Sequence, residues 1–151
     1  MGSGRRRCSI RAAPEQIDAV MDFVNRQLEA LGCPEEARVD LDVAVDELLS
    51  NIIRYAYGPS RGEVTVRVEA QEEPKAVILT FLDQGAPFDP LAEERPDTTS
   101  LPARERPMGG LGLYLVRSLV DEITYARRDG QNVLTVHKEI GQGGTKPWQS
   151  P

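Results

Sequence analysis

The stretch from Val39 to Gly58, VDLDVAVDELLSNIIRYAYG, decides the fold. Its apolar residues recur every three or four positions, the spacing of a helix that buries one stripe in a core; they are Leu41, Val45, Leu48, Ile52 and Ala56. Glu47, Asn51, Arg54 and Gly58 form a second stripe, roughly a right angle from the first. Glu47 and Asn51 are neighbours on the helix surface, because they are one turn apart. The pair is either a solvated flank or one wall of a pocket, and this helix alone allows both interpretations.

The composition is that of one ordinary globular domain. The 151 residues are 40% hydrophobic and 28% charged, with a net charge of −6. This acidic balance argues against nonspecific binding of nucleic acid, which needs a basic surface. No apolar run approaches the roughly 20 residues of a membrane-spanning helix, and no signal peptide is recognisable. We therefore expect a cytoplasmic protein with no membrane partner.

Residues that serve as metal ligands or nucleophiles are few. Cys8 and Cys33 have no metal-binding spacing, and His137 is the single histidine. The absence of an export signal favours two free thiols in a reducing compartment. These counts exclude a metal site built from His and Cys, and they leave a Ser–His–Asp or Cys–His mechanism only if His137 takes part.

Hydrophobic periodicity predicts eight helices and strands. Strands are expected at 7–12, 63–70, 76–82, 122–128 and 132–138, and helices at 14–31, 35–57 and 108–120. Helices that pack against antiparallel hairpins form a two-layer α+β sandwich rather than an alternating βαβ fold. We expect a mixed, mostly antiparallel sheet with helices on one face. The domain should span residues 7–140, with flexible tails at 1–6 and 141–151.

Two further segments look functional. Asp83-Gln84-Gly85 follows the apolar strand 76–82, and a carboxylate in such a turn commonly just caps a nearby amide. Residues 109–112 (GGLG) open a helix, where glycines let backbone amides face an anion, although glycines also permit close packing. Between the two lies a segment of about 20 residues without periodicity, a length that is usually functional or disordered.

These residues could together hold a nucleotide. The amide oxygen of Asn51 suits Mg²⁺, a hard ion whose coordination is completed by water and phosphate. Glu47 could orient or deprotonate a hydroxyl or water that attacks the γ-phosphate. Asp83 could accept a hydrogen bond from the amine of adenine, and the segment between Asp83 and Gly109 could close over the nucleotide.

This combination, in this order, resembles the GHKL-type ATPases, the ATP-binding (Bergerat) fold of gyrase, Hsp90 and histidine kinases. Glu47-x-x-x-Asn51 is similar to the N-box of that family, Asp83-x-Gly85 to its first glycine box, and Gly110-x-Gly112 to its second. The resemblance spans about residues 7–138. The stretches ELLSNIIRYAY, DQGAPFDP, GGLGLYLVRSLVDEI and NVLTV are closest to the anti-sigma factor serine/threonine kinases of bacterial partner-switching systems.

The resemblance implies an ATP- and Mg²⁺-dependent protein serine/threonine kinase. Such a kinase binds a sigma factor and phosphorylates an anti-anti-sigma antagonist of the STAS fold, and homodimerisation is implied as well. Glu47 would be the catalytic base, and Asn51 would hold Mg²⁺. The residues implied to bind ATP are Asn51, Asp83, Gly85, Arg106, Gly109, Gly110, Leu111, Gly112 and Thr135.

The sequence departs from the family pattern at several positions. Ala86-Pro87 stands where a second glycine is usual, and Arg54 stands where this branch often has histidine. Arg104 is an alternative to Arg106 as the phosphate contact. Thr135 corresponds to a late threonine near the adenine, or it is an ordinary strand residue.

Two alternatives remain beside the kinase. In the first, the domain is a non-catalytic ATP-binding module that sequesters a partner protein, although the presence of Glu47 favours catalysis. In the second, the chain is a structural α+β domain without a ligand, which requires all three motifs to be coincidental.

Overall fold

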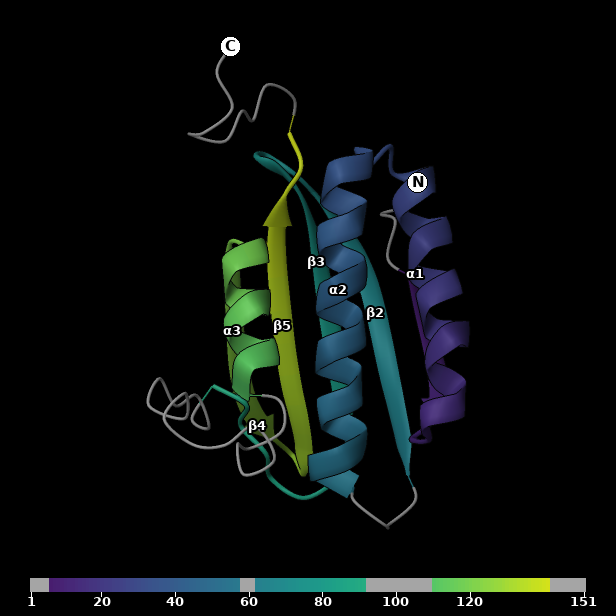
Figure 1. Cartoon of the computed structure of the whole chain (residues 1–151), viewed down its shortest axis with the longest axis vertical. Helices are drawn as coiled ribbons and strands as arrows, with labels where there is room; N and C mark the ends of the chain where they lie inside the picture. Colours follow the sequence, from purple (N-terminus) through teal and green to yellow (C-terminus); the bar gives the residue numbers. More distant parts are fainter. Residues whose placement is uncertain (1–5, 58–61, 92–109, 142–151) are drawn as a thin grey trace.

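The computed structural model describes residues 6–57, 62–91 and 110–141 (Figure 1). Each predicted helix and strand is present, with ends that differ by at most two residues. The elements in chain order are β1 (Arg6–Arg11), η1 (Pro14–Gln16), α1 (Ile17–Ala30), α2 (Glu35–Asn51), η2 (Ile52–Tyr57), β2 (Glu63–Glu72), β3 (Lys75–Asp83), α3 (Gly110–Leu119), β4 (Glu122–Arg128) and β5 (Gln131–Glu139). Residues 1–5 and 142–151 of the predicted tails 1–6 and 141–151 lie outside the described residues, as do the segments 58–61 and 92–109, whereas Arg6 belongs to β1.

The strands form one sheet with the order β1-β2-β3-β5-β4. Every pair in this described sheet is antiparallel. The helices α1, α2 and α3 lie together on one face of the sheet (Figure 1). The two-layer α+β sandwich that the sequence predicted is therefore confirmed, but the described sheet is wholly antiparallel rather than mixed.

The core lies between the helices and the sheet. Alternation along β2 places its valines toward the helices, and Val64, Val66 and Val68 are all fully buried. The apolar stripe of the long predicted helix meets them from the other side, and its members are at most 5% exposed. This stripe is therefore the core face of α2, as its spacing indicated.

The opposite face of the sheet carries a mixture of polar and apolar side chains. Thr80 of β3 pairs in register with Thr135 of β5, and Leu82 pairs with Val133. These residues alternate with the helix-facing ones, so they point away from α1, α2 and α3. None of the helices in the described parts of the chain covers this face (Figure 1), and none is long and apolar enough to cross a membrane.

The helix predicted at 35–57 changes its winding near its end. The α-helical hydrogen bonding of α2 stops at Asn51, and Ile52–Tyr57 continue as the π-helical segment η2. Such wide turns occur frequently at functional sites. Here the change begins directly after the Asn51 side chain that the sequence indicated as functional.

Candidate functional site

Asp83 lies at the end of β3 and is only 2% exposed. Its Oδ1 accepts two hydrogen bonds, from the backbone N–H of Gly85 at 2.9 Å and from Asn132 Nδ2 at 2.9 Å. Its Oδ2 accepts no hydrogen bond from any other residue that the structure describes. A buried carboxylate thus has one oxygen held by the protein and one available to a donor on a ligand.

Asn132 was not predicted as a site residue, although it supports Asp83 directly. It pairs with Asp83 in the β3–β5 register and is 3% exposed. Its Nδ2 also donates to the carbonyl of Ala86 at 2.8 Å, and its Oδ1 accepts from the Tyr125 hydroxyl and, at 3.3 Å, from Phe88 N–H. Both groups of the amide are therefore satisfied. The sequence did contain an indication of this role, because the alternation of β5 puts the polar Asn132 at a position that faces the helices.

Burial raises the pKa of Asp83 above its usual value, since desolvation disfavours the charged carboxylate. The hydrogen bonds from Asn132 and Gly85 and the positive charge of Arg127 act in the opposite direction. Arg127 also donates to the carbonyl of Gly85 at 2.9 Å. The Asp83 carboxyl is therefore incompletely compensated, which favours a ligand that brings its own hydrogen-bond donor.

The end of the long helix holds the turn that follows Asp83. The backbone N–H of Ala86 donates to the carbonyl of Ala56 at 2.9 Å. The Tyr57 hydroxyl accepts from the N–H of Gln84 at 2.9 Å and donates to the carbonyl of Glu63 at 2.7 Å. These bonds join the end of β3 to the end of the helix.

Gly85 is required in this turn because of the close approach to η2. A Cβ atom on Gly85 would lie 2.6 Å from the carbonyl oxygen of Ala56, well inside van der Waals contact. The glycine that the family pattern calls the first glycine box thus has a physical reason here. The departure at Ala86 is accommodated, because only the backbone of Ala86 takes part in the contacts with Ala56 and Asn132.

Asn51 and Glu47 lie on the same helix that anchors this turn. Asn51 is 4% exposed, and its carboxamide makes no hydrogen bond to any other described residue. It is the last residue of α2, five residues before Ala56 of η2. Glu47 is half-buried one turn earlier, whereas Arg54, the third member of the predicted stripe, is exposed. The polar stripe is therefore a buried wall at Asn51 and a solvated flank at Arg54.

Asn51 fits a magnesium site only if a bound ligand supplies the other groups that coordinate the ion. Within the described ranges, no group of three or more His, Cys, Asp or Glu side chains could hold a metal ion. The amide oxygen of Asn51, which accepts no hydrogen bond from another described residue, suits a hard cation that keeps water and binds phosphate oxygens. A bound Mg²⁺ would thus depend on a phosphorylated ligand for its other contacts.

The glycine-rich segment is only partly within the described chain. Gly110, Leu111 and Gly112 form the first turn of α3, and α3 lies beside α2 (Figure 1). A helix start presents unpaired N–H groups and the positive end of the helix dipole, which attract anions. Gly109, Arg104 and Arg106 lie outside the described residues, so their predicted phosphate contacts stay predictions.

The expectation that Thr135 lies near Asp83 is wrong. Thr135 pairs with Thr80 of β3 and with Thr124 of β4, whereas Asp83 pairs with Asn132. An offset of three residues along a strand places two side chains on opposite faces of the sheet. Thr135 therefore points away from the helices, and Asn132 takes the place beside Asp83.

Among the described residues, a buried carboxylate with one free oxygen at a strand end, a buried amide on the adjoining helix and a glycine-rich helix start form the arrangement expected of a nucleotide-binding α+β sandwich. Comparison with known families agrees: the model of the histidine kinase-like ATPase domain matches residues 10–138. The chain belongs to this family. This confirms the resemblance to the GHKL-type ATPases that the motifs suggested.

The most similar proteins fall in the kinase branch of that family. The chain is 33% identical over 128 residues to the serine-protein kinase RsbW of Bacillus velezensis, covering 82% of this chain and 79% of that protein. It is 30% identical to RsbW of Bacillus subtilis over the same shares of the two chains. The crystal structure of the RsbU and RsbW domains of Rv1364c from Mycobacterium tuberculosis superposes with a TM-score of 0.63 at 17% identity, covering 90% of this chain and 32% of that one. This last likeness concerns the fold.

Proposed function

We propose that the chain is an ATP-dependent serine/threonine protein kinase that binds a sigma factor and phosphorylates an anti-anti-sigma antagonist of the STAS fold. The names of the relatives support the kinase activity. The observation that carries the proposal is the buried Asp83 carboxylate, whose Oδ1 is held by Asn132 and Gly85 while its Oδ2 has no partner among the described residues. An acceptor of this kind matches the exocyclic amine of adenine.

In the proposed complex, the turn at Asp83 and Gly85 holds the adenine and the start of α3 holds the phosphates. Gly109, Gly110, Leu111 and Gly112 would offer backbone N–H groups to the phosphate oxygens. Arg106 would add a positive charge at the γ-phosphate. Thr135 is not part of this proposal, because its side chain points to the other face of the sheet.

Asn51 and Glu47 would supply the chemistry at the phosphate end. Asn51 would give its amide oxygen to Mg²⁺, which, when bound, neutralises charge on the phosphates. Glu47 would accept the proton of the incoming serine or threonine hydroxyl. The hydroxyl oxygen would bond to the γ-phosphorus as ADP leaves. The one-turn spacing of the two side chains on α2 supports this division, because it puts base and metal ligand side by side.

The first experiment measures ATP binding with Mg²⁺ by calorimetry on the wild type and on Asp83→Asn. Asp89→Asn is the matched control, because the Asp89 carboxylate accepts from the N–H of Leu91 in the same region and shares no hydrogen bond with Asp83 or Asn132 among the described residues. We expect binding by the wild type and the control and loss of binding by Asp83→Asn. Binding that is unchanged in Asp83→Asn would contradict the adenine site.

The second experiment separates a kinase from a non-catalytic ATP-binding module. Glu47→Ala should bind ATP nearly as the wild type does, yet lose phosphotransfer to a purified STAS-fold antagonist from the same genome. Full turnover by Glu47→Ala would show that Glu47 is not the base. If the wild type binds ATP and transfers no phosphate to such an antagonist, the sequestering module is the better description.

The proposal includes a cytoplasmic homodimer. The sheet face without helices carries the half-buried apolar side chains of Ile78, Leu82 and Val133, and it offers a second copy an area to pack against. Sedimentation velocity on the wild type and on Leu82→Glu tests this. A wild type that is monomeric throughout the micromolar range would rule the homodimer out.

A further inference from the structure

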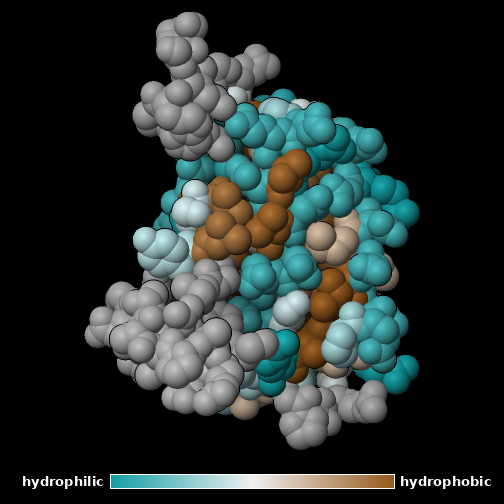
Figure 2. All heavy atoms as spheres, in the orientation of Figure 1, coloured by the Kyte–Doolittle hydropathy of each residue, from teal (hydrophilic) through white to brown (hydrophobic). Residues whose placement is uncertain are grey.

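An exposed group of apolar side chains lies on the outer face of the helical layer. Val39 of α2 is 55% exposed and Leu115 of α3 is 45% exposed. Val43 and Leu119, one turn further along their helices, are half-buried. Figure 2 shows apolar areas close together on the face that carries α2 and α3. We call these four residues the α2–α3 patch.

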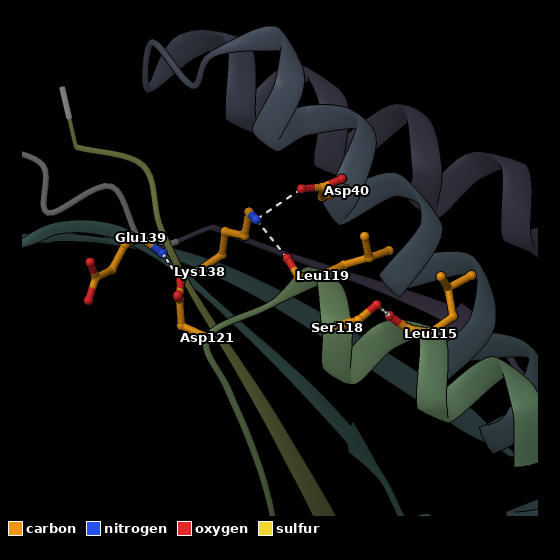
Figure 3. A network of polar contacts seen from close by, with 7 residues as sticks. All are labelled: Asp40, Leu115, Ser118, Leu119, Asp121, Lys138 and Glu139. Atoms are coloured by element: carbon orange, nitrogen blue, oxygen red, sulfur yellow. Dashed lines mark hydrogen bonds and ion pairs between the residues drawn. The ribbon is translucent and has the colours of Figure 1, made fainter. Parts of the chain in front are cut away.

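A buried lysine fixes the two helices that form the patch. Lys138 of β5 is 6% exposed, and its Nζ donates to Asp40 Oδ2 of α2 at 3.0 Å and to the carbonyl of Leu119 at 2.6 Å (Figure 3). In the same view, the side chains of Leu115 and Leu119 extend toward α2. One ammonium group on the sheet therefore joins α2 to the C-terminal end of α3. The helix dipole of α3 stabilises a positive charge at this end.

The contacts of Lys138 also place the apolar residues of the two helices near one another. Val43 is one turn past Asp40 on α2, and Leu115 is one turn before Leu119 on α3. The two helices run side by side (Figure 1), and the lysine places Asp40 next to Leu119. The apolar side chains thus lie on the solvent side of a fixed helix pair, and their exposure is not the result of a loose contact.

The surroundings of the patch are acidic. α2 has six carboxylates and one arginine, a formal balance of −5. That arginine, Arg38, forms an ion pair of 3.7 Å with Glu29 of α1, on the other side of α2. Asp46 and Glu47 follow Val43 by three and four residues, so they border the patch on the helix surface. An apolar strip with an acidic border selects a partner with the opposite charge.

We propose that the α2–α3 patch docks an amphipathic helix of a partner protein, whose apolar stripe is flanked by lysine and arginine. Helices commonly bind proteins in this way, with apolar anchors spaced by one turn. A second copy of this chain fits poorly, because its net charge is −6 and α2 would meet its own acidic border. The biological role rests on the proposed function, since a partner-switching kinase needs such surfaces, whereas docking itself needs no nucleotide.

The test uses two synthetic peptides of about five helical turns with the same content of Leu, Lys and Ala. One carries its leucines on a single helix face, and the other has the same residues in scrambled order. We expect the first peptide to bind the full chain without nucleotide, with NMR shift changes centred on Val39 and Leu115. The double variant Val39→Thr/Leu115→Gln should weaken this binding about tenfold. Tyr114→Gln is the matched control, because Tyr114 is 65% exposed on α3 but does not belong to the patch.

Several results would overturn the proposal. Equal binding of both peptides would mean nonspecific attraction to an acidic protein, and unchanged affinity in the double variant would place the contact elsewhere. Self-association that disappears in Val39→Thr/Leu115→Gln would make a second copy the occupant. Because no nucleotide is present, a failure here is distinct from a failure of the ATP-binding proposal, which is measured on Asp83→Asn.

Discussion

The side-chain amide of Asn132 donates a hydrogen bond of 2.9 Å to Asp83 Oδ1 across the pairing of β3 and β5. The same nitrogen donates to the carbonyl of Ala86, so Asn132 fixes both the carboxylate and the turn behind it. Tyr125 in turn holds the oxygen of the amide. Asn132 is therefore a positioning residue for Asp83, and its effects should appear through that carboxylate.

Asn132→Leu keeps the size of the side chain and removes the donor. The pKa of Asp83 should rise further, because a hydrogen bond that favours the ionised form is lost. We expect ATP affinity to fall at least about tenfold, the effect of one lost charged hydrogen bond, and to weaken more as the pH falls. Calorimetry over a pH series measures this. Gln131→Leu is the control, and an Asn132→Leu protein with wild-type affinity and pH dependence would refute the positioning role.

Asp83→Asn should stabilise the protein at neutral pH while it removes nucleotide binding. The pKa of Asp83 is raised by burial, so the folded state binds the proton more tightly than the unfolded state does. The stability that this preference contributes is present at low pH and is lost as the pH rises through the folded pKa. Asparagine avoids the buried charge and can still accept from Asn132. In thermal denaturation without nucleotide, Asp83→Asn should melt at or above the wild-type temperature at pH 7. The difference should vanish below about pH 4, where Asp83 is protonated. A variant that is less stable at pH 7 would contradict this.

Gly85→Ala should move the turn away from η2. The added Cβ would lie 2.6 Å from the Ala56 carbonyl oxygen, so the bond between Ala86 N–H and Ala56 must lengthen or break. We expect a loss of roughly 1–3 kcal/mol in the free energy of unfolding, measured in urea, together with weaker ATP binding. Gly141→Ala is the control, since the nearest atom to its Cβ would be at an ordinary 3.8 Å. Equal stability of the two variants would argue against the close approach at Gly85.

Lys138→Met should destabilise the pairing of α2 with α3. It would remove the ammonium group that pairs with the Asp40 carboxylate, 15% exposed, and the loss of one member of a buried ion pair costs about 3 kcal/mol. The double variant Lys138→Met/Asp40→Leu should recover part of this stability, because the charge of Asp40 is removed together with that of its partner. Urea denaturation of the single and double variants measures the coupling. If the double variant is as unstable as Lys138→Met alone, the pair is not the cause.

Much of the fold followed from patterns of single residues. The stripe of Leu41, Val45 and Leu48 and the alternating valines of β2 each indicate one element and its buried face, and both are buried as predicted. The arrangement of the site was harder to predict from the sequence. Thr135 was predicted near Asp83, but whether two residues on neighbouring strands lie on the same face of the sheet depends on the β3–β5 register. No local pattern in the sequence gives the pairing of Asp83 with Asn132. The π-helical winding of η2, where the carbonyl of Ala56 accepts the backbone N–H of Ala86, was not predicted from the sequence either.

The pairing that supports Asp83 also has a consequence for the order of events during synthesis and folding. Asp83 and Asn132 are 49 residues apart, and β5 is the last of the described strands to leave the ribosome. A nascent chain that ends before Asn132 has the helix and the strand of the site but cannot hold the carboxylate in place. Contacts over such separations form slowly relative to local ones. If ATP binds at Asp83, it binds only chains in which β5 has paired with β3. ATP would then shift the equilibrium of the last folding step toward the folded state by mass action.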